Sequence, residues 1–88
     1  MNQVTYMAID AERRFQDQKW GTVAEHGHTL GGWILLIESE LAEAKYALIK
    51  GGEGRDSVRA ELVQVAALCV AALEEHGTWT TQSPEREL

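Results

Sequence analysis

The chain has 88 residues and a net charge of −6, from fourteen acidic and eight basic side chains. This length suits one small domain, and the acidic balance argues against non-specific binding to a nucleic-acid backbone, which needs a basic surface. The longest apolar run after Gln64, residues 65–73, is far shorter than the roughly 20 residues of a membrane span, so no membrane partner is expected.

The N-terminal segment and the single cysteine bear on location. Residues 1–10 lack a basic region followed by a long apolar run, so we expect no signal peptide and a cytoplasmic protein. Cys69 has no second cysteine with which to form an internal disulfide, and it lies in an apolar run. We expect it to be a small buried hydrophobic residue rather than a reactive thiol.

The first predicted helix covers about residues 3–18. Apolar side chains recur there with helical spacing, at Val4, Met7, Ala8, Ala11 and Phe15. Charged side chains occupy the other face, which we expect to point into solvent: Asp10, Glu12, Arg13, Arg14 and Asp17. The next segment, at about residues 19–29, contains two glycines and two histidines and is predicted to be a loop.

The second predicted helix covers about residues 30–50, with Thr29 as its N-cap. One stripe on this helix is apolar and is expected to face the core: Leu30, Trp33, Ile34, Ile37, Leu41, Ala44 and Leu48. Glu40 and Glu43 border that stripe, whereas Glu38 and Lys45 project to the opposite flank. The run Gly51-Gly52-Glu53-Gly54 is expected to end the helix, because glycine adopts the left-handed cap conformation.

The third predicted helix covers about residues 56–76 and is apolar nearly all round. Within residues 62–73 the one polar side chain is Gln64. Such a helix must be buried on most sides, and three helices of this length cannot cover it. We therefore expect an all-α protein whose three-helix protomer completes a four-helix-bundle-type core as a homodimer or homotetramer. Residues 1–79 are predicted to form the single domain and residues 80–88 a flexible C-terminal tail.

Four oxygen-bearing side chains on the second and third helices have matching spacings. Glu40 and Glu43 are three residues apart, on one helix face, and Glu61 and Gln64 repeat that spacing. In an antiparallel hairpin, Glu43 and Glu61 both lie about 12–13 Å from the centre of the turn, at roughly 1.5 Å of rise per residue. The two pairs can therefore face each other. Three carboxylates and one amide oxygen suit Mg²⁺, or Mn²⁺, rather than Zn²⁺.

Each of these residues also has a structural interpretation. Glutamates on an amphipathic helix are commonly solvated, and Gln64 can serve as a polar contact across a dimer interface. His26 and His28 form an HxH pair, which alone is weak evidence for a metal site. A carboxylate pair bordering an apolar stripe is costly unless something neutralises it. The solitary Gln64 within the apolar run also weighs against the structural interpretation, and both interpretations stay open at this point.

These residues resemble the MazG-like family of all-α nucleoside triphosphate pyrophosphohydrolases, whose motif runs EExxE, a gap, and then ExxD. The chain has Ser39-Glu40-Leu41-Ala42-Glu43 and later Glu61-Leu62-Val63-Gln64. Upstream stretches are also similar to short, phage-type members of the family: Glu12-Arg13, Gln18-Lys19-Trp20-Gly21, His26 or His28, and Trp33 followed by Ile34-Leu35-Leu36. The resemblance covers about residues 10–75.

The resemblance implies a metal-dependent enzyme of a bacterium or of a phage-infected host cell. It would cleave a nucleoside or deoxynucleoside triphosphate between the α- and β-phosphates, giving the monophosphate and pyrophosphate. Glu40, Glu43 and Glu61 would be its catalytic, Mg²⁺-binding residues, with Gln64 a weak fourth ligand. Arg13, Lys19 and Lys45 would be the basic residues near the substrate, and Trp20 would stack on the base; each basic residue can equally be solvated helix surface.

Two positions depart from the pattern of the family. Ser39 stands where the family has its first glutamate, and Gln64 stands where it has aspartate. Fewer negative ligands weaken metal binding, and serine cannot replace a carboxylate as the base that activates water. The alternative interpretation is therefore a catalytically weak or inactive nucleotide-binding module of the same fold. A third is a helical interaction protein in which the acids are surface residues.

Overall fold

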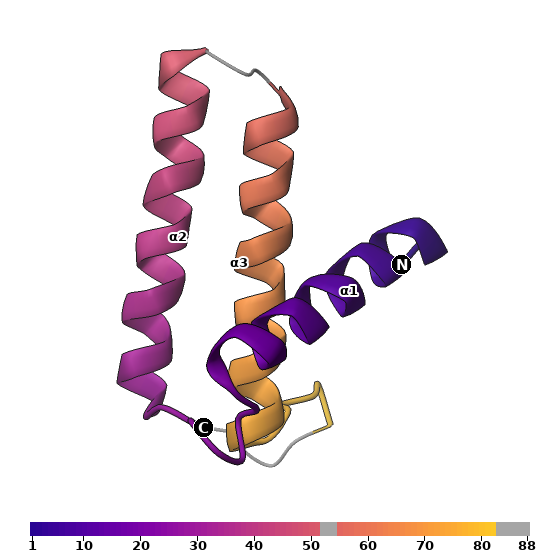
Figure 1. Ribbon diagram of the computed structural model, residues 1–88. Coiled ribbons are helices and arrows are strands. Elements are labelled where there is room, and N and C mark those ends of the chain that lie inside the picture. Colours follow the sequence, from indigo (N-terminus) through magenta and orange to yellow (C-terminus); the bar gives the residue numbers. More distant parts are fainter. Residues whose placement is uncertain (52–54, 83–88) are drawn as a thin grey trace.

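The computed structural model describes residues 1–51 and 55–82, and every regular element among them is a helix (Figure 1). The helices are α1 (Gln3–Trp20), α2 (Leu30–Lys50) and α3 (Arg55–His76). The predicted all-α class is confirmed for this part of the chain. Only α1 extends appreciably beyond its predicted span, by two residues at its C-terminal end. The predicted turn after Gly51 and the predicted tail beyond Gln82 lie outside the described residues.

Local capping explains where the helices begin and end. The Thr29 hydroxyl accepts the Gly32 N–H at 3.0 Å, which confirms the predicted N-cap of α2. Asn2 caps α1 in the same way, through the Thr5 N–H, although the sequence pattern did not single it out. Gly51 ends α2 with a positive φ of 61°, the left-handed conformation expected of it.

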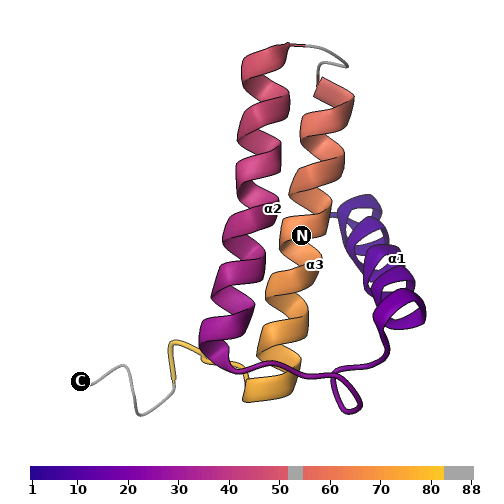
Figure 2. The ribbon, with the colours of Figure 1, turned by 60° about the vertical axis from the view of Figure 1, so that its left-hand side comes forward.

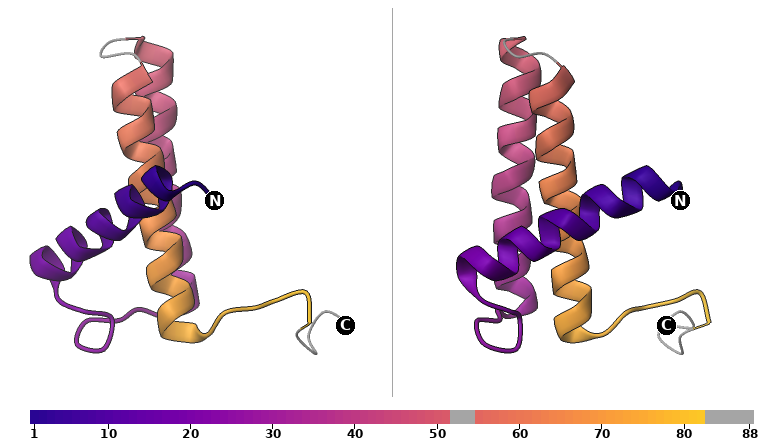
Figure 3. Two further views of the ribbon diagram at one scale, coloured as in Figure 1. Left: turned by 90° about the vertical axis from the view of Figure 1, so that its right-hand side faces the viewer. Right: turned by 45° about the vertical axis from the view of Figure 1, so that its right-hand side comes forward.

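The three helices are arranged around α3. α2 and α3 form an antiparallel hairpin, and α1 crosses one face of α3 obliquely (Figures 2 and 3). The core lies near the start of α2 and the end of α3, where Trp33 packs on Leu68, Ala71 and Ala72. Among the described residues, no helix has both the length and the apolarity that a membrane crossing requires.

The apolar stripe of α2 is only partly covered. Trp33 and Ala44 are buried and Ile37 is half-buried, because they face α3. Four apolar side chains farther round the helix remain more than half exposed: Leu30, Ile34, Leu41 and Leu48. The prediction that the whole stripe faces the core is therefore wrong for the single chain. One neighbouring helix covers only part of a stripe about 100° wide.

The face of α1 that contacts α3 is polar, contrary to the sequence prediction. Gln16 is buried, and four of the five charged residues that were expected to face solvent are half-buried: Asp10, Glu12, Arg13 and Asp17. Arg13 reaches Glu74 of α3, with 3.6 Å between nitrogen and oxygen. The apolar side chains of α1 are instead more than half exposed at Val4, Met7 and Phe15. Periodicity identifies the apolar face of a helix, but it does not say whether the chain itself supplies a partner for that face.

α3 has one side that neither neighbour covers. Small side chains line its contacts and are buried at Ala67, Ala71 and Ala72. Leu62 and Leu73 lie on the remaining side and are about half exposed. Cys69 is half-buried and free, rather than fully buried as expected. The near-continuous apolar run of α3 is therefore not satisfied within one chain.

Candidate metal centre and adjoining pocket

Three carboxylates meet across the α2–α3 hairpin. Glu40 and Glu43 come from successive turns of α2 and Glu61 from α3, and one oxygen of each lies within 4.8 Å of the others. This geometry confirms the convergence expected from the helical rise and the length of the turn. Among the described residues, this is the one group of three or more His, Cys, Asp or Glu side chains arranged closely enough to hold an ion. His26 and His28 therefore belong to no such group.

The carboxylate cluster is strained electrostatically. Burial, hydrogen bonding to Glu61 and the charges of Glu43 and Glu61 together raise the pKa of Glu40 to about 7, with burial as the largest cause. One oxygen each of Glu40 and Glu61, Oε2 in both, is buried without a hydrogen-bond partner. Buried carboxylate oxygens normally have partners. A proton or a cation bound among the three groups would relieve both problems.

Gln64 lies one helical turn beyond Glu61 on α3 and is half-buried. Its position is where the predicted fourth ligand would have to be, because residues three apart share a helix face. Three carboxylates with an amide oxygen are hard ligands, and they suit Mg²⁺ or Mn²⁺. Glu43 is exposed, so the cluster opens to solvent on one side.

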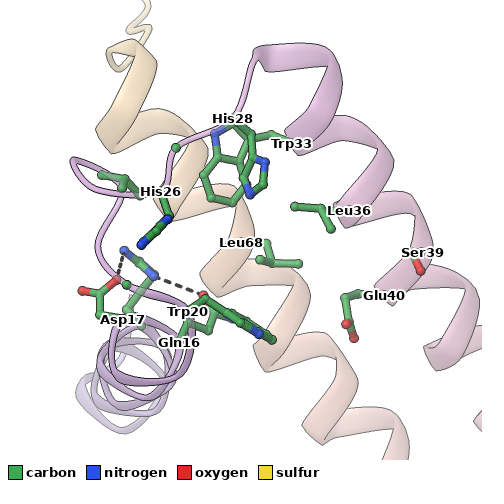
Figure 4. Close-up of a pocket in the computed structure, with 14 residues that line it drawn as sticks. Gln16, Asp17, Trp20, His26, His28, Trp33, Leu36, Ser39, Glu40 and Leu68 are labelled. Atoms are coloured by element: carbon green, nitrogen blue, oxygen red, sulfur yellow. Dashed lines mark hydrogen bonds and ion pairs between the residues drawn. The ribbon is translucent and has the colours of Figure 1, made fainter.

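A pocket of about 500 Å³ adjoins the cluster, between α1, the 21–29 loop and α2, with Leu68 of α3 at its back (Figure 4). Its lining comes from all three helices and the loop: Arg13, Gln16, Asp17, Trp20, Gly21, Val23, His26, Gly27, His28, Trp33, Leu36, Ser39, Glu40 and Leu68. Ligand pockets typically enclose about 300–1,000 Å³ and combine apolar walls with a few polar groups. This cavity therefore has the size and the lining of a site for a small molecule.

Glu40 belongs both to the pocket wall and to the carboxylate cluster. Ser39 also lines the pocket. A ligand in the pocket thus has one end beside an acidic group that faces two further acids. Trp20 is half exposed and its ring extends across the pocket from α1 toward the side of Glu40 (Figure 4).

The four residues predicted to contact substrate are placed differently. Trp20 and Arg13 line the pocket, whereas Lys19 and Lys45 are exposed and are not among its lining residues. The Lys19 ammonium lies over the Trp20 ring, 4.9 Å from its centroid. Trp20 itself lines the pocket. Lys19 therefore sits at the pocket edge through Trp20, and Lys45 lies elsewhere on α2.

Arg13 is held within the protein rather than presented as an isolated cation. Its side chain is 11% exposed and its guanidinium donates to Asp17 at 2.9 Å and to Gln16 at 3.2 Å. Glu74 supplies a second carboxylate at 3.6 Å. Two acids already balance this charge, so Arg13 contributes position and hydrogen bonding to the pocket more than net positive potential.

Sequence reasoning missed the residues that fix the wall of the pocket. Glu75 accepts hydrogen bonds from the backbone of His28 and from the indole of Trp33. The sequence indicated only that Glu74, Glu75 and His76 end the third helix. A contact across 47 positions leaves no local pattern, and the one available signal was an acid close to a helix end.

Searches against family models, curated proteins and solved structures give no match to this chain.

Proposed function

We propose that the protein is a metal-dependent nucleoside triphosphate pyrophosphohydrolase, converting a (d)NTP to the monophosphate and pyrophosphate. The single observation that supports this most strongly is the convergence of Glu40, Glu43 and Glu61 beside a pocket of about 500 Å³. In this proposal the three carboxylates and Gln64 hold Mg²⁺, or Mn²⁺. The type of reaction is inferred from the resemblance of the sequence motifs. The carboxylate cluster and the adjoining pocket support it by offering a candidate site for the metal and the substrate.

The residues present fit a divalent cation. Two carboxylate oxygens of the cluster are buried without a partner, and the pKa of Glu40 is raised. Both features are expected of a cation-binding cluster in which no cation is bound. Bound among these oxygens, Mg²⁺ would neutralise phosphate charge and supply an activated water. The chain's own contribution is to fix the ligands on two packed helices and to join them to the pocket through Glu40.

The pocket supports a nucleotide as the ligand. The phosphates would lie toward Glu40 and the metal, and the nucleoside would occupy the cavity between α1 and the loop. Trp20 offers an aromatic face for the base, while Lys19 at the pocket edge and Lys45 on α2 lie outside the lining and would contact only protruding phosphates. The pocket wall also offers polar side chains, including Arg13 and Asp17, for the edges of the base or sugar.

The alternative of a catalytically weak or inactive nucleotide-binding module has one observation in its favour. Ser39 lines the pocket next to Glu40, so a hydroxyl stands where a spare carboxylate would take the proton from an attacking water. Gln64 also contributes no negative charge. Binding without turnover is the outcome that these two residues would produce.

Release of pyrophosphate tests the proposal. The protein is incubated with each (d)NTP and Mg²⁺, together with Glu40→Gln and Glu61→Gln and with the matched surface variant Glu38→Gln. We expect Mg²⁺-dependent release that both cluster variants abolish and Glu38→Gln retains. Nucleotide binding without release favours the binding module. Absence of any nucleotide or Mg²⁺ effect on the melting temperature rejects both and leaves an interaction protein.

We also propose that the active form is a homo-oligomer, built on the exposed apolar face of the hairpin. We call this the hairpin face and define it as Leu30, Ile34, Leu41 and Leu48 of α2 with Leu62 and Leu73 of α3. Leu36 and Ser39 point to the pocket on the side of α1, so helical geometry places the α2 members of the hairpin face on the opposite flank.

The surface area supports a second copy as the partner. The accessible surface is 6804 Å², whereas a compact monomer of 9.8 kDa exposes about 5,200 Å². A stable interface buries about 800 Å² per partner, and the excess surface is about twice that.

A further inference from the structure

The loop between α1 and α2 forms one wall of the pocket. It contributes Gly21, Val23, His26, Gly27 and His28 to the lining. Its first half is a turn closed on itself, because Thr22 donates to the Glu25 carboxylate through both its backbone and its hydroxyl. The position of the second half, which carries Gly27 and His28, is set by contacts with α3.

The last turn of α3 holds this second half in place. The Glu75 carboxylate oxygen Oε1 accepts the His28 N–H at 2.9 Å and the Trp33 indole N–H at 2.6 Å. The His76 ring lies against the same segment, with Nε2 2.6 Å from the His28 carbonyl oxygen. The His28 ring in turn packs edge-on against Trp33, with 4.8 Å between centroids. Loop, α2 and α3 are thus joined at one carboxylate.

Gly27 shows how closely the loop approaches Glu75. A Cβ at this position would lie 2.0 Å from the nearer carboxylate oxygen and 2.5 Å from the carboxyl carbon. No real Cβ lies at such distances, so with any residue larger than glycine the Glu75 carboxylate or the loop must move, which disturbs the hydrogen bonds from His28 and Trp33. Gly31, four residues on, makes no such approach: a Cβ there would meet only the Thr29 hydroxyl, at 3.9 Å.

The Glu75 contacts are also required energetically. Trp33 is 5% exposed, so its indole N–H would be a buried donor without an acceptor if Glu75 were removed. The hydrogen bonds from His28 and Trp33 hold the pKa of Glu75 below its usual range, which keeps the carboxylate ionised at neutral pH. Hydrogen bonds to an ionised acceptor are stronger than those between neutral groups.

We infer that Glu75 is a positioning residue for the pocket: its carboxylate, behind the wall, holds Trp33 and the Gly27–His28 segment where a ligand must rest on them. Glu75 itself is not among the lining residues. It acts through Gly27, His28 and Trp33, all three of which line the cavity. The inference rests on the proposed function for the identity of the ligand, a nucleotide, but not for the geometry of the wall.

Variants of Glu75 separate its acceptor from its charge. Both hydrogen bonds end on one oxygen, so Glu75→Gln retains an acceptor for both donors, whereas Glu75→Met keeps the length of the side chain without an acceptor. Glu38→Met, on the exposed flank of α2, is the matched control. We expect Glu75→Met to weaken nucleotide binding, or to raise KM, about tenfold, the effect of losing one such hydrogen bond. Glu75→Gln should restore most of it.

Two readouts distinguish positioning from a general loss of structure. The Mg²⁺ affinity of the carboxylate cluster should be the same in Glu75→Met and wild type, because Glu75 belongs to a different part of α3. In proton NMR, the Trp33 indole N–H, bonded to a carboxylate at 2.6 Å, should resonate downfield of the Trp20 and Trp79 signals and shift upfield in Glu75→Met. An unchanged Trp33 resonance, or unchanged nucleotide affinity in a protein that binds nucleotide, overturns the inference.

A second pair of variants tests the same wall if Glu75→Met fails to fold. Gly27→Ala should weaken nucleotide binding and shift the Trp33 indole signal, whereas Gly31→Ala should do neither. In a double-mutant cycle, Gly27→Ala and Glu75→Gln should couple, since both act on one contact. Additive effects contradict the inference. If wild type binds no nucleotide, the proposed function fails, but the role of Glu75 can still be tested by hydrogen exchange of the His28 amide. Faster exchange in Glu75→Met or in Gly27→Ala supports the role, and unchanged exchange in both contradicts it.

Discussion

Glu40 is the residue at which the carboxylate cluster and the pocket meet. Its oxygens face Glu43 and Glu61 on one side, and its side chain lines the cavity on the other. A carboxyl group in this position is poorly suited to stabilise a folded chain, because burial and like charges both oppose its ionisation. Residues that break local rules of stability in this way are commonly the functional ones.

The raised pKa of Glu40 predicts how stability depends on pH without metal. The pKa of Glu40 in the folded protein is about 7, against the ordinary 4.5 of a glutamate side chain. Between these values the folded state binds more protons than the unfolded state, so stability falls as pH rises from 4.5 through 7. Thermal unfolding in EDTA should show a melting temperature that decreases over this interval. The decrease should be much smaller in Glu40→Gln, and equal slopes in the two proteins would contradict the assigned burial and repulsion.

Gln64 offers a prediction about the ligand set. Replacing its amide by a carboxylate, in Gln64→Asp, adds a negative charge one turn from Glu61. We expect Mg²⁺ affinity to rise by about tenfold or less, because charge count tunes such sites, and the metal-free protein to become less stable through repulsion. Calorimetric titration measures the first and thermal unfolding the second. If neither changes, Gln64 is not directed at the cluster.

Among the elements, α2 was the most predictable. Thr29 at its start, a glycine at its end and an apolar stripe between them are local signals, and each acts through the nearest few residues. The convergence of Glu43 with Glu61 was predictable for a related reason. A short connection between straight helices fixes which heights come opposite, so counting residues from the turn sufficed.

The orientation of α1 and the hydrogen bonds from His28 and Trp33 to Glu75 were not predictable. The apolar face of α1, with Val4 and Phe15, was identified, but its exposure depends on what lies outside the single chain. Glu75 bonds to His28 across 47 positions, and no periodicity or short motif encodes such a pair. Patterns along a sequence report the conformation of an element and its faces; they do not report which distant polar group will meet which.

The N-cap of α2 yields a prediction at the scale of the element. Removing the Thr29 hydroxyl, in Thr29→Ala, leaves the Gly32 N–H without its partner. This should cost about 1 kcal/mol of unfolding free energy, or a melting temperature about 4–8 °C lower for a domain of this size. Thr29→Ser keeps the hydroxyl and should unfold near wild type. Chemical denaturation monitored by circular dichroism compares the three; equal stability of Thr29→Ala and Thr29→Ser would contradict the cap.

At the scale of the whole molecule, the exposed hairpin face predicts self-association. Light scattering of the wild type at tens of micromolar should give the mass of a dimer or tetramer. Leu41→Lys introduces a charge in the middle of the hairpin face and should shift the population toward monomer. Leu35→Lys is the control, because Leu35 is also more than half exposed but lies on another flank of α2. A monomeric wild type, or equal behaviour of the two variants, would remove the case for this interface.

The account depends above all on a cation bound by Glu40, Glu43 and Glu61, and calorimetric titration of Mg²⁺ at pH 8 tests it most directly. At that pH Glu40 is largely ionised and no proton competes strongly for the site. We predict one saturable Mg²⁺ site per chain, with affinity at least about tenfold lower in Glu40→Gln and in Glu61→Gln, and unchanged in Glu38→Gln. Wild-type protein without saturable Mg²⁺ binding, or cluster variants that bind as well as Glu38→Gln, would contradict the account.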